Sequence, residues 1–361
     1  MNIRFFCDDP WSVKTTDFPE SGTSLEKLTF LLNYAVLAPS VLGTEPWCFY
    51  VSDNSLVLRI DPARRLPVTD PEGREMMISC GAALLNLRVA AAFYGQDLHL
   101  MAFPEEQRSD VVVKATLGPR KTSAADPKLF ESITKRRTSR GGFAVRPMSE
   151  DLPHRLTEAA RQEGAVLSFL VDTEAQIGML ALAAEARRQQ LAILAYRNEL
   201  SHWVQKRVAE ARDHESEAWH RLGKPSGPLA GTTPEPLDRP ELATPSAAGF
   251  ARMLANGADT PEDRATSDNS SVLALLATAS DSKEDWLMVG QALQRVLLVA
   301  AVEDVSAAYI NAPIEKEKFR RQVGRIFHVK GSPQIMLRMG TGTQRPPTPR
   351  RPMAEVVKLD S

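Results

Sequence analysis

The chain has 361 residues, of which 43% are hydrophobic and 25% are charged, and its formal net charge is −1. This length exceeds the roughly 100–200 residues of a usual domain and is enough for a large buried core. The near-zero charge excludes a basic surface field of the kind that binds nucleic acid, so we expect no nucleic-acid partner.

The three cysteines, Cys7, Cys48 and Cys80, include no CxxC pair. Such a set is a poor disulfide framework and favours a reducing compartment. The N-terminal residues contain no apolar run of signal-peptide length. We expect no segment to provide the roughly 20 apolar residues of a membrane span. We therefore predict a cytoplasmic protein without a membrane partner.

The first elements in chain order are a helix, a loop at 37–47 and two strands, all within residues 24–60. An apolar helix then covers residues 81–92, and strand-like runs follow at 98–103 and 110–118. Strands that follow a buried helix indicate α+β or α/β architecture rather than a helical bundle.

The next elements are helices over 128–139 and 150–164, a strand over 165–172 and a long helical pattern over 173–221. A strand at 270–278, a helix at 290–301 and strands at 306–310 and 333–340 complete the series. Residues 222–268 hold seven prolines and are typical of a linker or a covering loop. We favour a covering loop, or lid, because the segment lies inside the second half.

The two apolar helices are similar in sequence at an offset of 209 residues. Gly81 aligns with Gly290, Ala83 with Ala292 and Leu84 with Leu293. Their small residues would let another helix approach closely. A repeat of this size predicts duplicated domains. We expect an N-terminal half at 1–122 and a C-terminal half at 123–361.

Two arginine-rich stretches are candidates for chemistry. Residues 135–140 read KRRTSR, and residues 348–352 read TPRRP. A solvated charge run is the ordinary interpretation of either stretch alone. Planar guanidiniums bind phosphate through paired hydrogen bonds, and the neighbouring hydroxyls add donors. The two stretches together predict a site for a phosphate monoester.

The usual catalytic motifs are missing from the sequence. It contains no P-loop, no GxGxxG after a strand, no HExxH and no GxSxG. We predict no metal site and no catalytic side chain, so any reaction would depend on a bound cofactor.

These motifs and their order resemble the FMN-dependent nitroreductase family, and within it the duplicated, Acg-like branch. The segment APSVLGTEPW at 38–47 is similar to the family's APSxxNxQPW loop, and RRTSR at 136–140 is similar to its RRSxR motif. Residues 70–88 and the tail from 331 resemble the Acg-like branch. The resemblance implies an α+β nitroreductase-like fold.

The resemblance also implies which residues hold FMN. Arginine-cluster residues of the C-terminal half would bind its phosphate, ribityl and pyrimidine end, and the tail would add to the phosphate site. The Ala312–Glu315 backbone would lie beside the flavin N5 edge, and the 38–47 loop would pack on the ring from the other half. The implied residues are Pro39, Ser40, Arg136, Arg137, Thr138, Arg140, Pro313, Ile314, Glu315, Arg350 and Arg351.

Each half carries only part of this site. The first half has the 38–47 loop but no arginine cluster, and the second half has the cluster but no such loop. We therefore expect one FMN per chain and a monomer that imitates the family's dimer. Two positions depart from the family pattern, because Gly43 replaces an Asn and Glu45 replaces a Gln. We expect Glu45 to be protonated, exposed or paired with Arg64, Arg65 or Arg74.

Three functions remain open at this point. The first is an oxidoreductase that passes electrons from NAD(P)H through FMN to a small nitroaromatic or quinone-type acceptor. The second is a flavin-sequestering protein whose lid covers FMN and prevents turnover. The third is a scaffold that has lost flavin, and the retained arginine clusters argue against it.

Overall fold

The computed structural model describes residue 7 and residues 9–105, 107–120, 126–139, 143, 146–213, 271–342 and 347–359. The Pro-rich segment 222–268 lies outside these residues. The first part of the described chain forms helices around a four-stranded antiparallel sheet. Its elements are η1 (Pro10–Ser12), η2 (Thr15–Asp17), α1 (Ser24–Ala35), η3 (Val41–Gly43), β1 (Trp47–Ser52), β2 (Ser55–Ile60), η4 (Pro62–Arg64), α2 (Arg74–Phe93), β3 (Gln96–Ala102) and β4 (Val111–Arg120).

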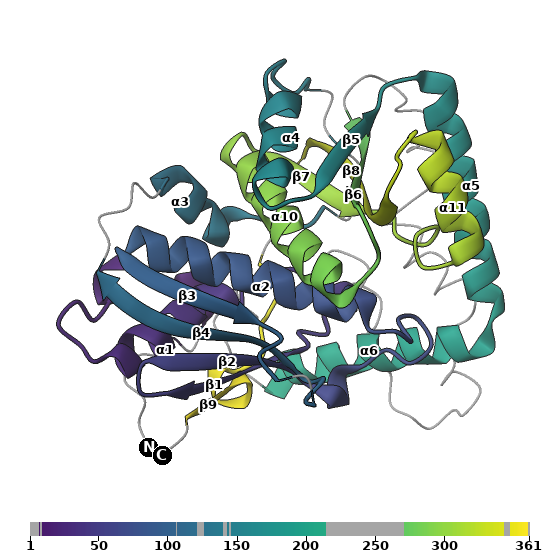
Figure 1. Cartoon of the computed structure of the whole chain (residues 1–361). Coiled ribbons are helices and arrows are strands. Elements are labelled where there is room, and N and C mark those ends of the chain that lie inside the picture. Colours follow the sequence, from purple (N-terminus) through teal and green to yellow (C-terminus); the bar gives the residue numbers. More distant parts are fainter. Residues whose placement is uncertain are drawn as a thin grey trace.

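The second part repeats this plan with a helical insertion and a C-terminal tail (Figure 1). Its elements are α3 (Pro127–Lys135), α4 (Leu152–Gln162), β5 (Val166–Leu170), α5 (Thr173–Ala192), α6 (Leu194–Asp213), β6 (Ser271–Thr278), α10 (Lys283–Val302), β7 (Val305–Tyr309), α11 (Glu317–Ile326), β8 (Ser332–Thr341), α12 (Met353–Val356) and β9 (Val357–Leu359).

The two sheets have the same strand order. The first runs β3-β4-β2-β1, with β9 added at its end, and the second runs β7-β8-β6-β5. Neighbouring strands are antiparallel in both four-stranded sets. In each set the long helix lies between the second and third strands of the chain order. The α+β fold class is confirmed, and the repeat in the sequence corresponds to a repeat in topology.

The long helices α2 and α10 cross where the repeat aligned two glycines. A Cβ added to Gly81 would lie 2.2 Å from the Leu287 carbonyl oxygen, and one added to Gly290 would lie 2.1 Å from the Ile78 oxygen. Any side chain would therefore separate the two backbones. One hydrophobic cluster continues through both helices and both sheets. The halves thus share a core, as the two helices in the middle of Figure 1 show.

Both crossing helices are long and apolar enough to span a membrane, which the sequence reading did not anticipate. Most of the apolar window of each is buried within the protein, at 78% for α2 and 67% for α10. Core helices of this kind pass the same test of length and composition. Their apolar character is accounted for by the contact between the halves.

The C-terminal tail returns to the first half. β9 pairs in parallel with β1, with Phe49 opposite Val357 and Val51 opposite Leu359. The equivalent strand of the second sheet, β5, has β6 as its only partner strand among the described residues. The tail is therefore where the two otherwise similar sheets differ.

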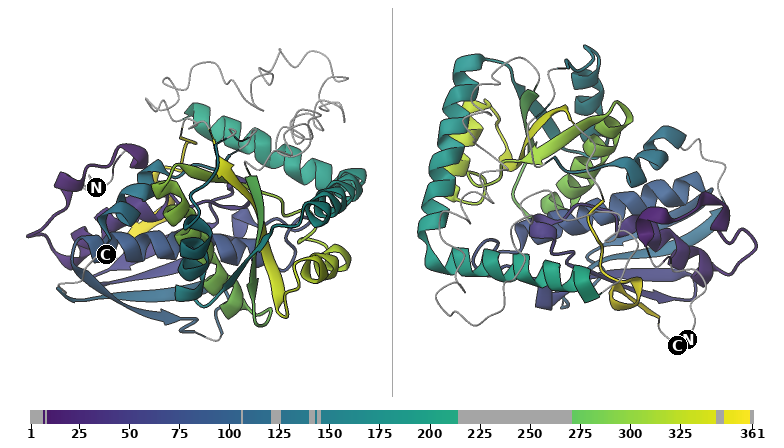
Figure 2. Two further views of the ribbon diagram at one scale, coloured as in Figure 1. Left: turned by 90° about the horizontal axis from the view of Figure 1, so that it is seen from above. Right: turned by 180° about the vertical axis from the view of Figure 1, so that it is seen from behind.

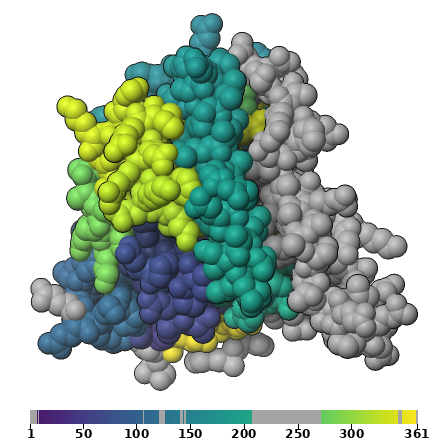
Figure 3. All heavy atoms as spheres, turned by 90° about the vertical axis from the view of Figure 1, so that its right-hand side faces the viewer, coloured from purple at the N-terminus to yellow at the C-terminus, as the bar shows by residue number. Residues whose placement is uncertain are grey.

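The described part of the insertion between β5 and β6, residues 173–213, forms two helices where the sequence predicted one helical pattern over 173–221. The break lies at Ile193, whose φ of −83° and ψ of 117° are those of extended chain. α5 lies beside α11 (Figure 3), and α6 turns back toward the first half (Figure 2). There Tyr196 and Leu200 pack with Leu42 of η3.

Candidate functional site

Arg136 is the most deeply buried of the arginines predicted to bind phosphate. It follows α3 directly and is 4% exposed. Its guanidinium donates two long hydrogen bonds of 3.4 Å, to the Leu37 carbonyl and the Thr138 hydroxyl, and its Nε has no hydrogen-bond partner among the described residues. Burial lowers its pKa to about 10, and the neighbouring Arg137 acts in the same direction.

The residues after Arg136 are fixed by the edge of β7. Thr138 forms a parallel bridge with Ala307, and the Ser139 N–H donates to the Ala307 carbonyl at 2.8 Å. These contacts hold the turn that carries the arginines against the second sheet. Arg140, the last predicted residue of this cluster, lies outside the described residues.

Arg137 and Arg350 meet at Trp11. Their guanidinium carbons lie 4.1 and 4.9 Å from the centre of the Trp11 ring. Burial lowers the pKa of Arg137 to about 10, and Arg350 lowers it further. Arg350 also donates to the carbonyls of Val36, Leu37 and Ala38 at 2.9–3.3 Å. Arg136 and Arg350, from two distant segments, thus both donate to the Leu37 carbonyl, and Arg137 lies beside Arg350 at the Trp11 ring.

Arg351 has a different position from its neighbour. Its guanidinium donates to the Glu45 carbonyl at 3.0 Å and pairs with Asp61 at 3.2 Å. Its backbone N–H donates to the Glu45 carboxylate at 3.0 Å. The two tail arginines are therefore separated: Arg350 lies with the arginine cluster, and Arg351 anchors the tail to the loop.

The 38–47 loop has a backbone that few residues adopt easily. Leu42, Gly43 and Glu45 have φ values of 48°, 67° and 48°, in the region that favours glycine. The Ser40 hydroxyl accepts from the Glu45 N–H at 3.0 Å, and the Val41 N–H donates to the Ser79 hydroxyl at 3.2 Å. Gly43 thus suits a strained turn that is tied to α2.

Glu45 is 4% exposed, so it does not point to solvent. Its carboxylate accepts from the Arg351 backbone N–H at 3.0 Å, and the Arg64 guanidinium donates to the adjacent Thr44 carbonyl at 3.0 Å. A buried carboxylate is stabilised by N–H donors and a nearby cation. The contact with Arg351 joins the loop to the tail across 306 residues of chain.

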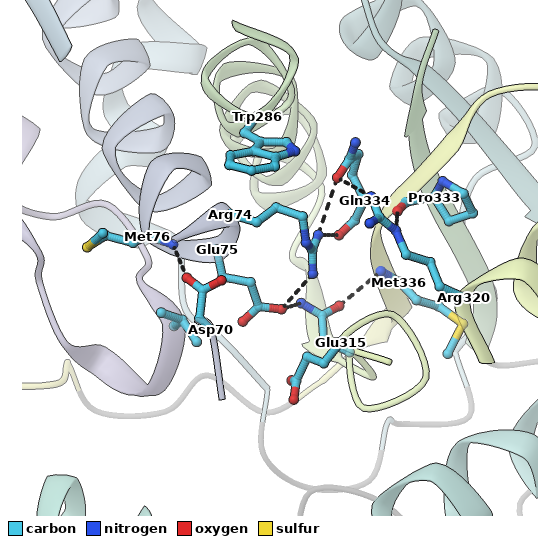
Figure 4. Close-up of polar contacts among 12 residues, drawn as sticks. Asp70, Arg74, Glu75, Met76, Trp286, Glu315, Arg320, Pro333, Gln334 and Met336 are labelled. Atoms are coloured by element: carbon cyan, nitrogen blue, oxygen red, sulfur yellow. Dashed lines mark hydrogen bonds and ion pairs between the residues drawn. The ribbon is translucent and has the colours of Figure 1, made fainter. Parts of the chain in front are cut away.

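A second group of buried polar side chains lies beyond the end of β7. Asn311 donates to the Glu75 carboxylate at 3.0 Å, and Gln190 of α5 donates to Glu315 at 2.5 Å. Pro313 and Ile314, between Asn311 and Glu315, are buried. Figure 4 shows Glu75, in the first turn of α2, reaching toward this turn, while the Asp70 carboxylate accepts from the Met76 backbone N–H. The predicted 312–315 segment therefore faces the first half of the chain.

Burial raises the pKa of the carboxyls in and beside this group. Burial, followed by the nearby Glu315, raises the pKa of Glu75 to about 8. Burial also raises the pKa of Glu315 and of Asp70. The Tyr309 phenol, whose pKa is raised to about 12 by burial, has no hydrogen-bond partner among the described residues.

Sequence reasoning missed Trp11, Glu75, Gln190 and Tyr309. The sequence carries a signal only for Glu75, which is an acid at the start of an apolar helix. The other three acquire their positions from contacts between distant segments. Among the residues that the structure describes, no three His, Cys, Asp or Glu side chains are grouped to hold a metal ion.

Comparison with known proteins gives relatives that match along nearly the whole chain, although no family model matches. "Putative NAD(P)H nitroreductase Rv3131" of Mycobacterium tuberculosis is 32% identical over 352 residues, covering 95% of this chain and 93% of the relative. "Putative NAD(P)H nitroreductase acg" of the same organism is 24% identical and covers 94% and 97%.

A solved structure is also similar to part of the chain. It is a point mutant of the FMN- and NADPH-dependent nitroreductase NfnB from sphigopyxis sp. strain HMH, with 16% identity and a TM-score of 0.36. The match covers 64% of this chain and 97% of the other.

Proposed function

The chain belongs to the nitroreductase-like family of these mycobacterial proteins, in its Acg-like branch, and we propose that it binds one FMN and acts as an NAD(P)H-dependent oxidoreductase. The electron acceptor in this proposal is a small nitroaromatic or quinone-type molecule. The protein itself would be a cytoplasmic monomer.

The observation that carries the proposal is the buried guanidinium of Arg136. A buried cation without a counter-charge costs several kcal/mol, and Arg136 has two long hydrogen bonds and another arginine beside it. A phosphate dianion would supply the missing charge and accept from the unpartnered Nε atoms of Arg136 and Arg137. The residues present therefore fit the phosphate end of FMN.

The other residues of the second half proposed to contact FMN follow the phosphate site along β7. Thr138 and Arg140 would bind the ribityl and pyrimidine end next to the phosphate. β7 leads from Ala307, beside Thr138, to the turn at 312–315, whose backbone would lie at the N5 edge. Pro39 and Ser40 would pack on the ring from the first half, held by the contact between Val41 and Ser79.

When bound, FMN supplies hydride acceptance and electron transfer, and the protein supplies placement and charge. The positive field of the arginines would favour an anionic form of the bound cofactor. Glu75 holds a proton near neutral pH, because its pKa is raised to about 8, and lies at the turn that would border the ring edge. It is placed to keep that edge free of extra negative charge.

The test of this function uses the visible spectrum of the purified chain under anaerobic conditions. We expect a yellow protein that bleaches on addition of NADPH or NADH and regains its colour with a nitroaromatic or a quinone. A protein that stays colourless after incubation with FMN would contradict both flavin functions.

Flavin storage is a second candidate because α6 covers the loop that would contact the ring. Tyr196 and Leu200 pack on Leu42, and Glu199 accepts from the Val68 and Thr69 N–H groups at 3.0 and 2.8 Å. A yellow protein that stays oxidised with excess NADPH and NADH would favour storage over turnover. The predicted lid at 222–268 belongs to this candidate as well.

A further inference from the structure

Trp11 connects three segments that are far apart in the sequence. Its indole N–H donates to the Thr348 carbonyl at 2.8 Å, and its backbone N–H donates to the Asp9 carboxylate at 3.1 Å. The same ring lies against the guanidiniums of Arg137 and Arg350. The N-terminal segment, the arginine cluster and the tail therefore meet at one side chain.

The Trp11 ring holds two side chains of like charge close together. Arg137 and Arg350 are both cations, and Arg350 disfavours the charged form of Arg137. The face of an indole attracts a guanidinium without neutralising its charge. The indole face therefore brings the two cations together, and the Asp9 carboxylate favours the charged form of Arg137.

The orientation of the tail depends on the same residue. The Trp11 N–H holds Thr348, two residues before Arg350, and Arg350 itself donates to the Thr348 carbonyl at 3.2 Å. The short tail elements α12 and β9 begin three residues or more after Arg350. Trp11 thus fixes the chain on the N-terminal side of Arg350, where no regular element does so in the described residues.

We propose that Trp11 is a positioning residue for the phosphate end of the flavin, and that it holds Arg137 and Arg350 together as a preformed dianion clamp. This inference rests on the proposed FMN binding. It makes Trp11 a determinant of the preference for FMN over riboflavin, which lacks the phosphate. A residue that only packs the N-terminal segment would not affect that preference.

The experiment compares FMN and riboflavin affinities by quenching of flavin fluorescence in the flavin-free full chain. We expect Trp11→Leu, which keeps an apolar side chain without a π face, to weaken FMN binding by about tenfold and to change riboflavin binding by less than about twofold. Trp11→Phe, with a weaker π face, should lose FMN affinity by about two- to threefold. The smaller change in Trp11→Phe keeps the test usable if Trp11→Leu does not fold.

The matched control is Phe18→Leu. Phe18 is another N-terminal aromatic residue, and it stacks on Tyr94 with ring centres 4.1 Å apart. Its replacement should lower thermal stability without changing the ratio of the two affinities. In the background R137Q and R350Q, Trp11→Leu should no longer change that ratio, because the charges on which it acts are gone.

Equal weakening of FMN and riboflavin by Trp11→Leu, or an unchanged FMN affinity, would overturn the role of Trp11 while leaving FMN binding intact. Failure of the unaltered chain to bind FMN would overturn the proposed function and this inference together. The wild-type titration therefore separates the two failures.

Discussion

Arg136 and Glu75 are each 4% exposed, and in both cases the ionised form has too few compensating partners. Arg136 has two hydrogen bonds at 3.4 Å and an unpartnered Nε. Glu75 accepts from Arg74 and Asn311, but Glu315 and Asp70 oppose its negative charge. Uncompensated buried charges reduce the stability of a fold. They therefore mark places where a ligand or a proton would bind.

Replacing Arg136 with Met should separate stability from binding. The substitution removes an uncompensated buried cation and keeps a similar side-chain length. We expect the unfolding free energy of the flavin-free chain to stay the same or to rise by about 1–3 kcal/mol. FMN affinity should fall by about 10- to 100-fold, as for a lost charged hydrogen-bond donor. Urea denaturation and fluorescence titration measure the two effects.

The control for this substitution is Arg161→Met on α4, where Arg161 pairs with Glu158 at the surface. Arg161→Met should change neither the unfolding free energy nor the FMN affinity appreciably. If Arg136→Met lowered stability by several kcal/mol and left FMN affinity unchanged, Arg136 would be a structural residue and the phosphate assignment would fail.

Because of Glu75, the free energy of unfolding should fall as the pH rises. Its pKa in the folded state, about 8, is above the ordinary glutamate value of 4.5. Its contribution to stability is therefore fully present below pH 4.5 and is lost as the pH rises toward 8, by up to about 1.4 kcal/mol per pH unit. Glu75→Gln cannot ionise, so it should become more stable relative to wild type between pH 5 and 8.

The matched control is Glu284→Gln, at the equivalent position of α10, where the glutamate is exposed. Stability of both variants is measured by urea denaturation at several pH values. If the difference in unfolding free energy between wild type and Glu75→Gln were constant across pH 5–8, Glu75 would not carry a proton in the folded state in this range.

At the scale of elements, the sequence predicted that another helix would approach each apolar helix closely, and the structure shows that α2 and α10 approach each other. The alignment of Gly81 with Gly290 placed two glycines at equivalent points, and the structure puts their Cα atoms in the same contact. A pattern of small residues within an apolar helix specifies close approach because no other residue type allows it.

Gly81→Ala should therefore destabilise the chain by about 1–3 kcal/mol or more. Its Cβ would lie 2.2 Å from a backbone oxygen that cannot move independently. Gly178→Ala on α5 is the control, because its Cβ would have nothing within 4 Å, and it should stabilise by about 0.5–1 kcal/mol. Thermal unfolding measures the change in stability in each variant. Equal changes in Gly81→Ala and Gly178→Ala would contradict the close contact between α2 and α10.

Other elements were not predictable from local sequence. The break at Ile193 has no proline or glycine to mark it, so one helical pattern appeared where two helices form. β9 has three residues and becomes a strand because β1 offers an edge. Trp11, Gln190 and Tyr309 join the site through long-range contacts, which periodicity and spacing do not record.

For the whole molecule, the two halves have the same strand order and share one core, and we propose that their contact takes the place of a dimer interface. The halves differ where the candidate site lies: the strained 38–47 loop occurs in the first, and the buried arginine cluster begins the second. Because the surface that would form a dimer is already used inside the chain, we expect a monomer with a mass of 39.8 kDa. Sedimentation equilibrium measures this mass, and a stable dimer would contradict it.

The molar ratio of FMN to chain tests the composite site most directly. The flavin-free chain is saturated with FMN, freed of excess ligand by gel filtration and denatured, and released flavin is compared with protein. We predict a ratio of one, because only one pairing of loop and arginine cluster exists. A ratio of two would mean that both halves form complete sites, and a ratio of zero would mean that the buried arginines serve another purpose.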